Sequence, residues 1–503
     1  MKKILALFCL FSQIIFAQNK PNIIVFIVDD MGWQDCSLPF YKEKTTWNER
    51  YKTPNMERLA AQGKMFTHAY AASVCSPSRV SLMTGMNAIN HHVTNWTLRK
   101  NANNDGKSEI LTPPQINING LSAEPNIENT IYASPLPMVL KQNGYHTIHV
   151  GKAHLGANDT PGSDPLNLGF EVNIAGHAAG APHSYFGKDD FGNKDKKNLI
   201  WAVPGLEKYW GKEIFLTEAL TQEAIAELDK SQNSEKPFFL YMSHYAVHAP
   251  IMGDPRFLQK YYDMGIDSAE AKYAALIEGM DKSLGDIMDF LEKTKQDKNT
   301  AILFLSDNGG LSANARGGEK HMHNTPLKSG KGSAYEGGVR IPFIMKWPGK
   351  IKEKTKSTEN IIIEDIFPTV LQIANIKPQN IIQKIDGKSI LDKKLNNSKR
   401  FFFWHYPHIW GPKGPALKLY SVIRQGDWKL IYFHEDGSFE LYNTETDISE
   451  TKNLVFENEK LAKKLSKKLT SELKKGNSGM PTLIKTGQKI PYPDQALVSF
   501  LGN

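Results

Sequence analysis

The sequence predicts an α/β fold with a mostly parallel central sheet, followed by a smaller C-terminal α+β subdomain. Short, continuous apolar runs alternate with stretches of helical periodicity up to about residue 400, and this alternation is typical of parallel sheets covered by helices. Beyond that point the pattern changes to short strands separated by turn residues. The 503 residues are enough for more than one domain.

The strands predicted in the first part are rich in β-branched and aromatic residues. The first of them, at 22–28, reads Asn-Ile-Ile-Val-Phe-Ile-Val and ends at two aspartates. Because such runs lack the polar alternation of half-exposed strands, we expect them to be buried on both faces of the sheet. The others are predicted at 145–150, 237–243, 300–306 and 342–347.

Helices are predicted between these strands, where apolar residues recur every three or four positions. The helix at 77–86 begins at a proline, a residue suited to a first helical turn. The helix at 269–294 is the longest. The remaining helices are predicted at 54–62, 136–142, 215–228 and 363–374.

A C-terminal subdomain is predicted from residue 400 to 503, after a polar linker at 393–399. Its strands are expected at 420–424, 428–433 and 439–443, and an amphipathic helix at 457–475. That helix carries seven lysines against three glutamates and a leucine stripe on one face. A basic helix of this kind can bind membrane surfaces, but we expect the leucine stripe to pack on the subdomain.

Composition excludes several classes of protein. The formal net charge is only +8, without the concentrated basic face of a nucleic-acid binder, so no nucleic-acid partner is expected. The cysteines are Cys9, Cys36 and Cys75, too few for a disulfide scaffold or a four-cysteine metal site.

Residues 1–17 are expected to be a signal peptide. Lys2 and Lys3 precede the apolar run 4–10, and Ala17 offers a small residue for cleavage. A membrane anchor would need about 20 apolar residues without polar breaks. We therefore expect an exported protein without a membrane anchor, in the periplasm or secreted.

Polar side chains directly follow four of the predicted strands. In an open α/β sheet the carboxyl ends of the strands meet at the edge where ligands bind. Three carboxylates and an amide in this set suit a hard cation such as calcium or magnesium better than zinc. Taken singly, Asp-Asp or Asp-Asn-Gly after a strand can equally be a turn or a helix cap. The residues are Asp29, Asp30, Lys152, His154, His244, His248, Asp307 and Asn308.

The segment 75–85 reads Cys-Ser-Pro-Ser-Arg-Val-Ser-Leu-Met-Thr-Gly. It resembles the signature of the type I sulfatases, in which this cysteine is oxidised to Cα-formylglycine by a separate generating enzyme. Met83 stands where the family often has leucine, a volume-conserving change. The alternative is a buried cysteine before a helix that a proline initiates.

Further segments extend the resemblance over most of the chain. Within them Ala153 stands where the family usually has tryptophan, and Lys328 stands where it commonly has arginine. The resemblance implies an alkaline-phosphatase-like α/β sandwich, with a sulfatase domain at 18–399 and a C-terminal subdomain at 400–503. The matching segments are 21–35, 151–156, 238–250, 303–310 and 326–349.

The resemblance also implies the roles of the site residues. The hydrated aldehyde at position 75 would attack sulfur, His248 would protonate the leaving alcohol, and His154 would remove the proton of the second hydroxyl. Arg79 would hold the attacking hydroxyl, and the metal, Lys152 and Lys331 would neutralise charge on the sulfate oxygens. Calcium would be bound by Asp29, Asp30, residue 75 (Cys75), Asp307 and Asn308.

A sulfated carbohydrate, such as an oligosaccharide derived from a polysaccharide, is the expected substrate, because similar segments occur in exported bacterial sulfatases. Three stretches with histidine, tryptophan and arginine are expected to face it: 87–99, 173–185 and 404–410. The predicted substrate contacts within them are Arg99, His177 and His405.

Two other functions stay open. Phosphate and phosphonate monoester hydrolases share this fold and can share the formylglycine motif, and lysines at an anion site do not distinguish the two esters. A non-catalytic glycan-binding relative would have lost at least one catalytic or metal-ligand position, and none is missing.

Overall fold

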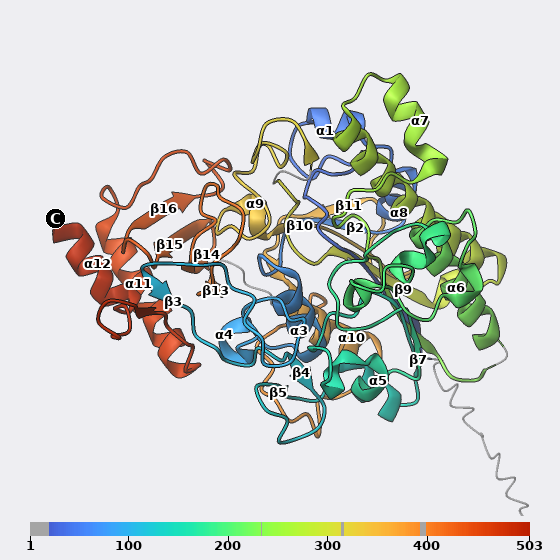
Figure 1. Cartoon of the computed structure of the whole chain (residues 1–503), viewed down its shortest axis with the longest axis horizontal. Helices are drawn as coiled ribbons and strands as arrows, with labels where there is room; N and C mark the ends of the chain where they lie inside the picture. The colour runs from blue at the N-terminus through green and yellow to red at the C-terminus, as the bar shows by residue number, and fades with distance from the viewer. Residues whose placement is uncertain (1–19, 233, 313–315, 393–398, 503) are drawn as a thin grey trace, which may run out of the picture.

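The computed structural model describes residues 20–232, 234–312, 316–392 and 399–502. The predicted signal peptide, with Cys9, lies outside the described residues, and so does most of the predicted linker at 393–399. A large sheet fills the centre of the molecule, and the C-terminal subdomain lies beside it (Figure 1). In the described part of the chain, no helix is long and apolar enough to cross a membrane.

The central sheet is mostly parallel, as predicted. Its strands run in the order β11-β2-β10-β9-β1-β8-β6-β7, with β12 also pairing with β2. Only β10 is antiparallel to its neighbours, β9 and β2. The bounds are β1 Asn22–Val28, β2 Lys64–Tyr70, β6 His146–Gly151, β7 Val172–Ile174, β8 Phe238–Ser243, β9 Thr300–Ser306, β10 Arg340–Lys346, β11 Thr355–Ser357 and β12 Ile361–Ile362.

Strand β1 is buried on both faces, which explains its continuous apolar sequence. Ile24, Phe26 and Val28 belong to the core on one side of the sheet. Ile23 and Ile27, between them in the alternation, belong to the core on the other side. Side chains of a strand alternate between its faces, so only an uninterrupted apolar run can satisfy two cores.

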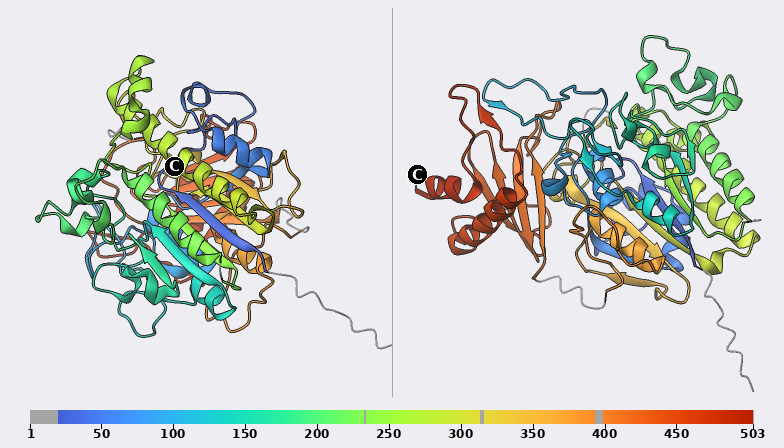
Figure 2. Two further views of the ribbon diagram at one scale, coloured as in Figure 1. Left: turned by 90° about the vertical axis from the view of Figure 1, so that its right-hand side faces the viewer. Right: turned by 90° about the horizontal axis from the view of Figure 1, so that it is seen from below.

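Helices cover both faces of this sheet (Figure 2). One layer packs around α8 (Ser268–Lys293), which contacts α2 (Pro54–Ala61), α6 (Leu216–Ser231) and α7 (Pro255–Asp263). The other packs around α3 (Cys75–Thr84), which contacts α5 (Leu136–Gln142) and α10 (Ile366–Ile373). The remaining helices of this part are short: α1 Thr46–Arg50, α4 Ala88–His91 and α9 Glu336–Val339.

The C-terminal subdomain is a four-stranded antiparallel sheet with two helices. Its strands are β13 (Phe401–Tyr406), β14 (Tyr420–Gln425), β15 (Trp428–Phe433) and β16 (Phe439–Asn443), in that order. Figure 2 shows α11 (Glu459–Lys475) and α12 (Pro493–Gly502) on the face of this sheet that points away from the central sheet.

The leucine stripe of α11 packs on this sheet, as expected. Leu465, Leu469 and Leu473 are fully buried in one core with strand residues of the subdomain. The stripe is therefore a docking face for the subdomain, and the lysines lie on the opposite, solvated side.

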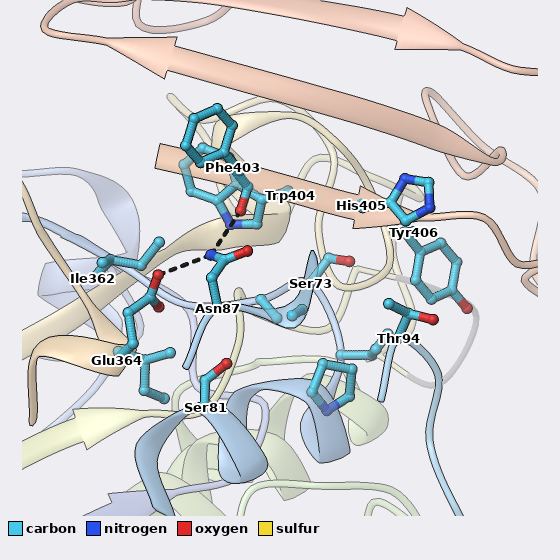
Figure 3. Close-up of a pocket in the computed structure, with 15 residues that line it drawn as sticks. Ser73, Ser81, Asn87, Thr94, Ile362, Glu364, Phe403, Trp404, His405 and Tyr406 are labelled. Atoms are coloured by element: carbon cyan, nitrogen blue, oxygen red, sulfur yellow. Dashed lines mark hydrogen bonds between the residues drawn. The ribbon is translucent and has the colours of Figure 1, made fainter. Parts of the chain in front are cut away.

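A small crevice separates α3 from β13 (Figure 3). It has room for about one water molecule (≈ 20 Å³). Glu364 lies in its wall and accepts a hydrogen bond of 2.8 Å from Asn87 Nδ2. Burial, together with the neighbouring charge of Asp365, raises the pKa of Glu364 to about 8.

Glu364 should make the protein less stable as pH rises. The folded protein keeps this proton up to about pH 8, whereas the unfolded chain releases it near pH 4.3, the ordinary carboxyl value. The folded state thus binds more protons between these values, so the free energy of unfolding falls with pH across that window. Glu364→Gln keeps an acceptor for Asn87 and should flatten the fall in urea midpoints between about pH 5 and about pH 9. An unchanged pH dependence would contradict this.

Candidate active site

The polar strand ends meet at one edge of the sheet, as the sequence indicated. Strands β9, β1, β8 and β6 are adjacent and parallel, so their carboxyl ends lie side by side. The side chains that follow them converge on the N-terminus of α3. Asp29, Asp30, Asp307 and Asn308 there have no solvent exposure.

Cys75 is the first residue of α3, and its Sγ lies 3.5 Å from Asp29 Oδ1. Arg79 stands four residues later, on the same face of the helix. Its Nε donates to Asp307 Oδ2 at 2.9 Å and its Nη1 to Ser243 Oγ at 2.7 Å. The motif spacing thus brings the Cys75 thiol and a fixed guanidinium to the same aspartate, Asp29.

Two lysines approach this point from opposite sides. Lys152 Nζ lies 2.6 Å from Asp29 Oδ2, and Lys331 Nζ lies 2.7 Å from Asp30 Oδ1. Lys152 is fully buried, whereas Lys331 retains 8% exposure and reaches the cavity described below.

Each of two histidines has one ring nitrogen committed to a carbonyl oxygen. His154 Nε2 lies 2.8 Å from Thr97 O, so Nε2 donates and the unpartnered, buried Nδ1 is the acceptor of the neutral ring. His248 Nδ1 donates to Ala249 O at 2.6 Å, which leaves Nε2, 3.5 Å from Asp30 Oδ2, to exchange a proton. Burial lowers the pKa of both rings, reinforced by Lys152 at His154 and by Lys331 at His248.

The buried carboxylates have opposite electrostatic environments. Burial and the charge of Asp307 raise the pKa of Asp29 well above its ordinary value. Burial acts in the same sense on Asp30, but Lys331 and His248 outweigh it and hold the Asp30 pKa well below its ordinary range. Clustered carboxylates of this kind are stabilised when a cation lies between them.

The residues present fit a hard metal ion. Ligand atoms of Asp29, Asp30, Cys75 and His248 all lie within 4.8 Å of one another. Asn308 Oδ1 is buried beside them without a hydrogen-bond partner, an oxygen that a cation would satisfy. Because carboxylate and amide oxygens dominate the set, calcium or magnesium suits it better than zinc.

A cavity of about 390 Å³ opens above Cys75. Its floor holds the reactive groups, and three tryptophans stand in its walls. The residues that line the cavity include Cys75, His154, His248, Lys331, Trp96, Trp201, Trp410, Asn104, Asp105, Gly180 and Ala181. Each of the three stretches predicted to face the substrate contributes to this lining.

The three individual substrate contacts predicted from the sequence do not line the cavity. His405 lies on β13 at the small crevice of Figure 3, where Nδ1 pairs with Ser421 Oγ and Nε2 with Gly479 O. Its expected sugar contact is corrected to a structural role, because both ring nitrogens are used in holding the subdomain together. Arg99 is exposed outside the cavity, and the His177 ring lies tilted against that of Tyr245, with the ring centres 6.4 Å apart.

His244, also at a strand end, bonds Ser283 Oγ through Nε2 in the interior. Lys328 lies 3.9 Å above the ring of Tyr335 and donates to Glu450 O, so it holds the C-terminal subdomain and does not reach the anion site.

Two residues that contribute to the site had little or no sequence pattern by which to predict them. Ser243 accepts from Arg79 and donates to Lys152 O at 2.7 Å, and its position as the last, polar residue of a buried strand could have indicated this. Trp201 lies in an irregular insertion between β7 and α6, and no local pattern points to it.

Gly180 fixes the position of His154. A Cβ at residue 180 would lie 2.3 Å from His154 Cε1 and 2.5 Å from Nδ1. Gly180→Ala should displace the ring and lower kcat by about 10²-fold, as a misplacement of about 1 Å does. The measurement is the turnover rate, with Gly502→Ala as control because a Cβ there meets nothing within 4 Å. Wild-type kcat in Gly180→Ala would show that His154 tolerates displacement.

Comparison with known proteins gives consistent matches. The family model described as Sulfatase matches residues 21–376, and a model described as N-sulphoglucosamine sulphohydrolase, C-terminal, matches residues 330–478. The N-acetylgalactosamine-6-sulfatase of Mus musculus is 34% identical over 87% of this chain and 77% of its own. A sulfatase of Formosa agariphila is 29% identical over 96% and 94%.

Solved structures show the same fold. The crystal structure of Ps i-CgsB in complex with k-i-k-neocarrahexaose superposes with a TM-score of 0.69 at 26% identity. The match covers 90% of this chain and 93% of that one.

Proposed function

The chain belongs to the type I sulfatase family and is a sulfuric ester hydrolase, and from this premise we propose that it removes sulfate from a carbohydrate, with a formylglycine made from Cys75 and a bound calcium ion. The observation that carries the proposal is the convergence of Cys75, Lys331, His154 and His248 at the floor of one cavity, with Arg79 and Lys152 buried directly beneath it. The relatives named N-acetylgalactosamine-6-sulfatase and the complex of Ps i-CgsB with k-i-k-neocarrahexaose support a sugar ester.

Calcium would be held by Asp29, Asp30, Asp307 and Asn308, where it would supply positive charge to the sulfate oxygens and acidify the nucleophilic hydroxyl. The formylglycine would supply that hydroxyl from its hydrated aldehyde, together with a second hydroxyl whose deprotonation releases sulfate.

The side chains of this chain perform the remaining tasks. Lys331, at the cavity floor, and Lys152, beneath it, bind the charge of the sulfate group. Arg79 fixes Asp307 and the carboxyl end of β8 through Ser243, so the anion site is rigid before substrate arrives. Preorganised charge of this kind lowers the barrier without rearrangement during the reaction.

The two histidines divide the proton transfers. His248 Nδ1 is committed to Ala249 O, so the proton for the leaving sugar oxygen must come from Nε2 of the imidazolium form. The Asp30 carboxylate, 3.5 Å from Nε2, favours that form, and the ring serves as the general acid and becomes neutral. His154 offers Nδ1 as an acceptor, because Nε2 is committed to Thr97 O, so it serves as the base that restores the aldehyde.

Maturation needs partners outside this chain. A formylglycine-generating enzyme would modify Cys75, and export through residues 1–17 would bring the protein to the periplasm or the medium. Cys36 and Cys75 are both free and buried, so conversion of Cys75 would leave Cys36 as the free cysteine of the described chain.

A matched pair of esters tests the proposal. Purified protein is assayed for anion release from a hexose 6-sulfate and from the corresponding 6-phosphate. We expect kcat/KM for the sulfate to exceed that for the phosphate by at least about 10²-fold. The reverse preference would assign the chain to the phosphate and phosphonate monoester hydrolases.

A further inference from the structure

The cavity has two zones of different chemistry. Of the described residues that line it, Lys331 is the only lysine or arginine, and it belongs to the floor with His154 and His248. Above the floor the walls consist mainly of indole rings, aliphatic carbon and backbone. The polar side chains of this upper zone are Asn104 and Asp105.

Three half-buried tryptophans from separate segments form the upper walls. Trp410 packs against the backbone next to the floor lysine, since a Cβ on Gly332 would lie 3.2 Å from its ring. The Lys331 ammonium is 6.0 Å from the centre of that ring. A group that follows the sulfate out of the floor therefore meets the indole of Trp410 first.

The other two rings are held by backbone hydrogen bonds. His183 N donates to Trp201 O at 2.8 Å, which ties Trp201 to the strap carrying Gly180. Asn104 Nδ2 donates to Trp96 O at 2.9 Å. These bonds fix the backbone that carries each indole, which leaves two side-chain torsions to order when the ring stacks on the apolar face of a sugar.

Asp105 joins two loops at the cavity through hydrogen bonds, so it acts as a clamp, and it contributes little surface to the cavity itself. Its side chain is only 2% exposed, and it pairs with His408 Nδ1 at 3.0 Å. It also accepts from Ile409 N at 3.0 Å, while Gly106 N donates to Ile409 O at 3.1 Å. The loop with Trp410 is thus fastened to the 104–106 loop. The charge that Asp105 adds to this zone is negative.

A second anion would therefore be unpaired in the upper zone. A carboxylate or sulfate on the same ring would lose water without gaining a cation among the described lining residues. A neutral ring avoids this cost and keeps the stacking contact.

We propose that the cavity selects a sugar ring that carries a single sulfate and is otherwise neutral, and that Trp96, Trp201 and Trp410 are its specificity-determining residues. This inference rests on the proposed sulfatase function. A ring with a second sulfate, or with a uronate carboxylate, is rejected by the absence of a cation in the upper zone rather than by size.

The test compares a hexose 6-sulfate with the same ring sulfated at two positions, using the holoenzyme. We expect kcat/KM for the monosulfated ring to be higher by at least about 30-fold, the cost of an unpaired charge.

Asn104→Lys places a cation in the upper zone and should reduce this preference by about tenfold. Trp410→Ala should raise KM for the monosulfated ring by about 3- to 10-fold.

Trp210→Ala is the matched control, because Trp210 is 38% exposed and lies outside the cavity lining. Its KM should stay at the wild-type value. Equal or faster cleavage of the disulfated ring, or equal effects of the Trp410 and Trp210 variants, would overturn the inference while sulfate release still upholds the proposed function. Failure to release sulfate from 4-nitrophenyl sulfate and from both sugars would refute the proposed function and this inference together.

Discussion

Replacing Cys75 with alanine should lower kcat by at least about 10⁴-fold, because the variant has no group that can become the nucleophile. The fold should survive the change. The Sγ atom has one polar contact, to Asp29 Oδ1 at 3.5 Å, and alanine is the residue most compatible with the first turn of α3. The measurement is sulfate release from 4-nitrophenyl sulfate, with a circular dichroism spectrum to report the fold.

The control for this variant is Cys36→Ala. Cys36 is the other free, buried cysteine, and its Sγ donates to Leu38 O at 3.4 Å, away from the active-site cavity. Cys36→Ala should keep the wild-type kcat. Turnover by Cys75→Ala above about 1% of the wild-type rate would show that residue 75 is not the nucleophile.

Replacing His248 with alanine should lower kcat for a sugar sulfate by about 10²- to 10⁴-fold, the usual contribution of a general acid. The loss should be far smaller with 4-nitrophenyl sulfate, whose leaving group departs without a proton. The prediction follows from the ring geometry: Nδ1 is committed to Ala249 O, so Nε2 is the nitrogen left to transfer a proton.

His183→Ala provides the comparison for the second variant. The His183 side chain is 34% exposed, pairs with Asp195 and does not line the cavity. Its replacement should leave both substrates unaffected. An equal loss on the two substrates in His248→Ala would assign His248 to sulfate binding and not to proton donation.

The central sheet could be predicted where burial on both faces leaves no room for polar residues. The run 22–28 and the other four predicted strands are confirmed as β1, β6, β8, β9 and β10. Strand β2 was missed, because Thr67 and His68 interrupt its apolar pattern and pairing with β10 and β11 stabilises it instead. Tertiary pairing of this kind leaves no local periodicity.

The floor of the site could be predicted and its walls could not. Cys75 opens a helix and Lys152 follows a strand, so their positions place them at one edge of the sheet. Lys331 lies in the connection between β9 and α9, and only the family resemblance pointed to it. His405 was misplaced because a histidine in an aromatic strand has the same local pattern whether it faces substrate or Ser421. Trp201 was missed because only the long-range packing of an irregular insertion carries it to the cavity.

The arrangement also explains why the C-terminal subdomain matters to the site. Trp410 comes from the loop after β13, and the Asp105 clamp fixes that loop over the cavity mouth. Buried charges join the two parts elsewhere, since Glu336 of α9 pairs with Arg424 at 3.2 Å and Lys429 at 3.1 Å. Removal of one partner would leave buried, uncompensated charge.

The account depends most on the chemical state of residue 75, which peptide mass reports directly. Trypsin should release the peptide 65–79, which contains Cys75 and ends at Arg79. In protein purified with its generating enzyme, we expect this peptide to be lighter than the cysteine form by about 18 Da and to react with a hydroxylamine probe, as an aldehyde does. Active enzyme in which residue 75 is entirely an unmodified thiol would contradict the account.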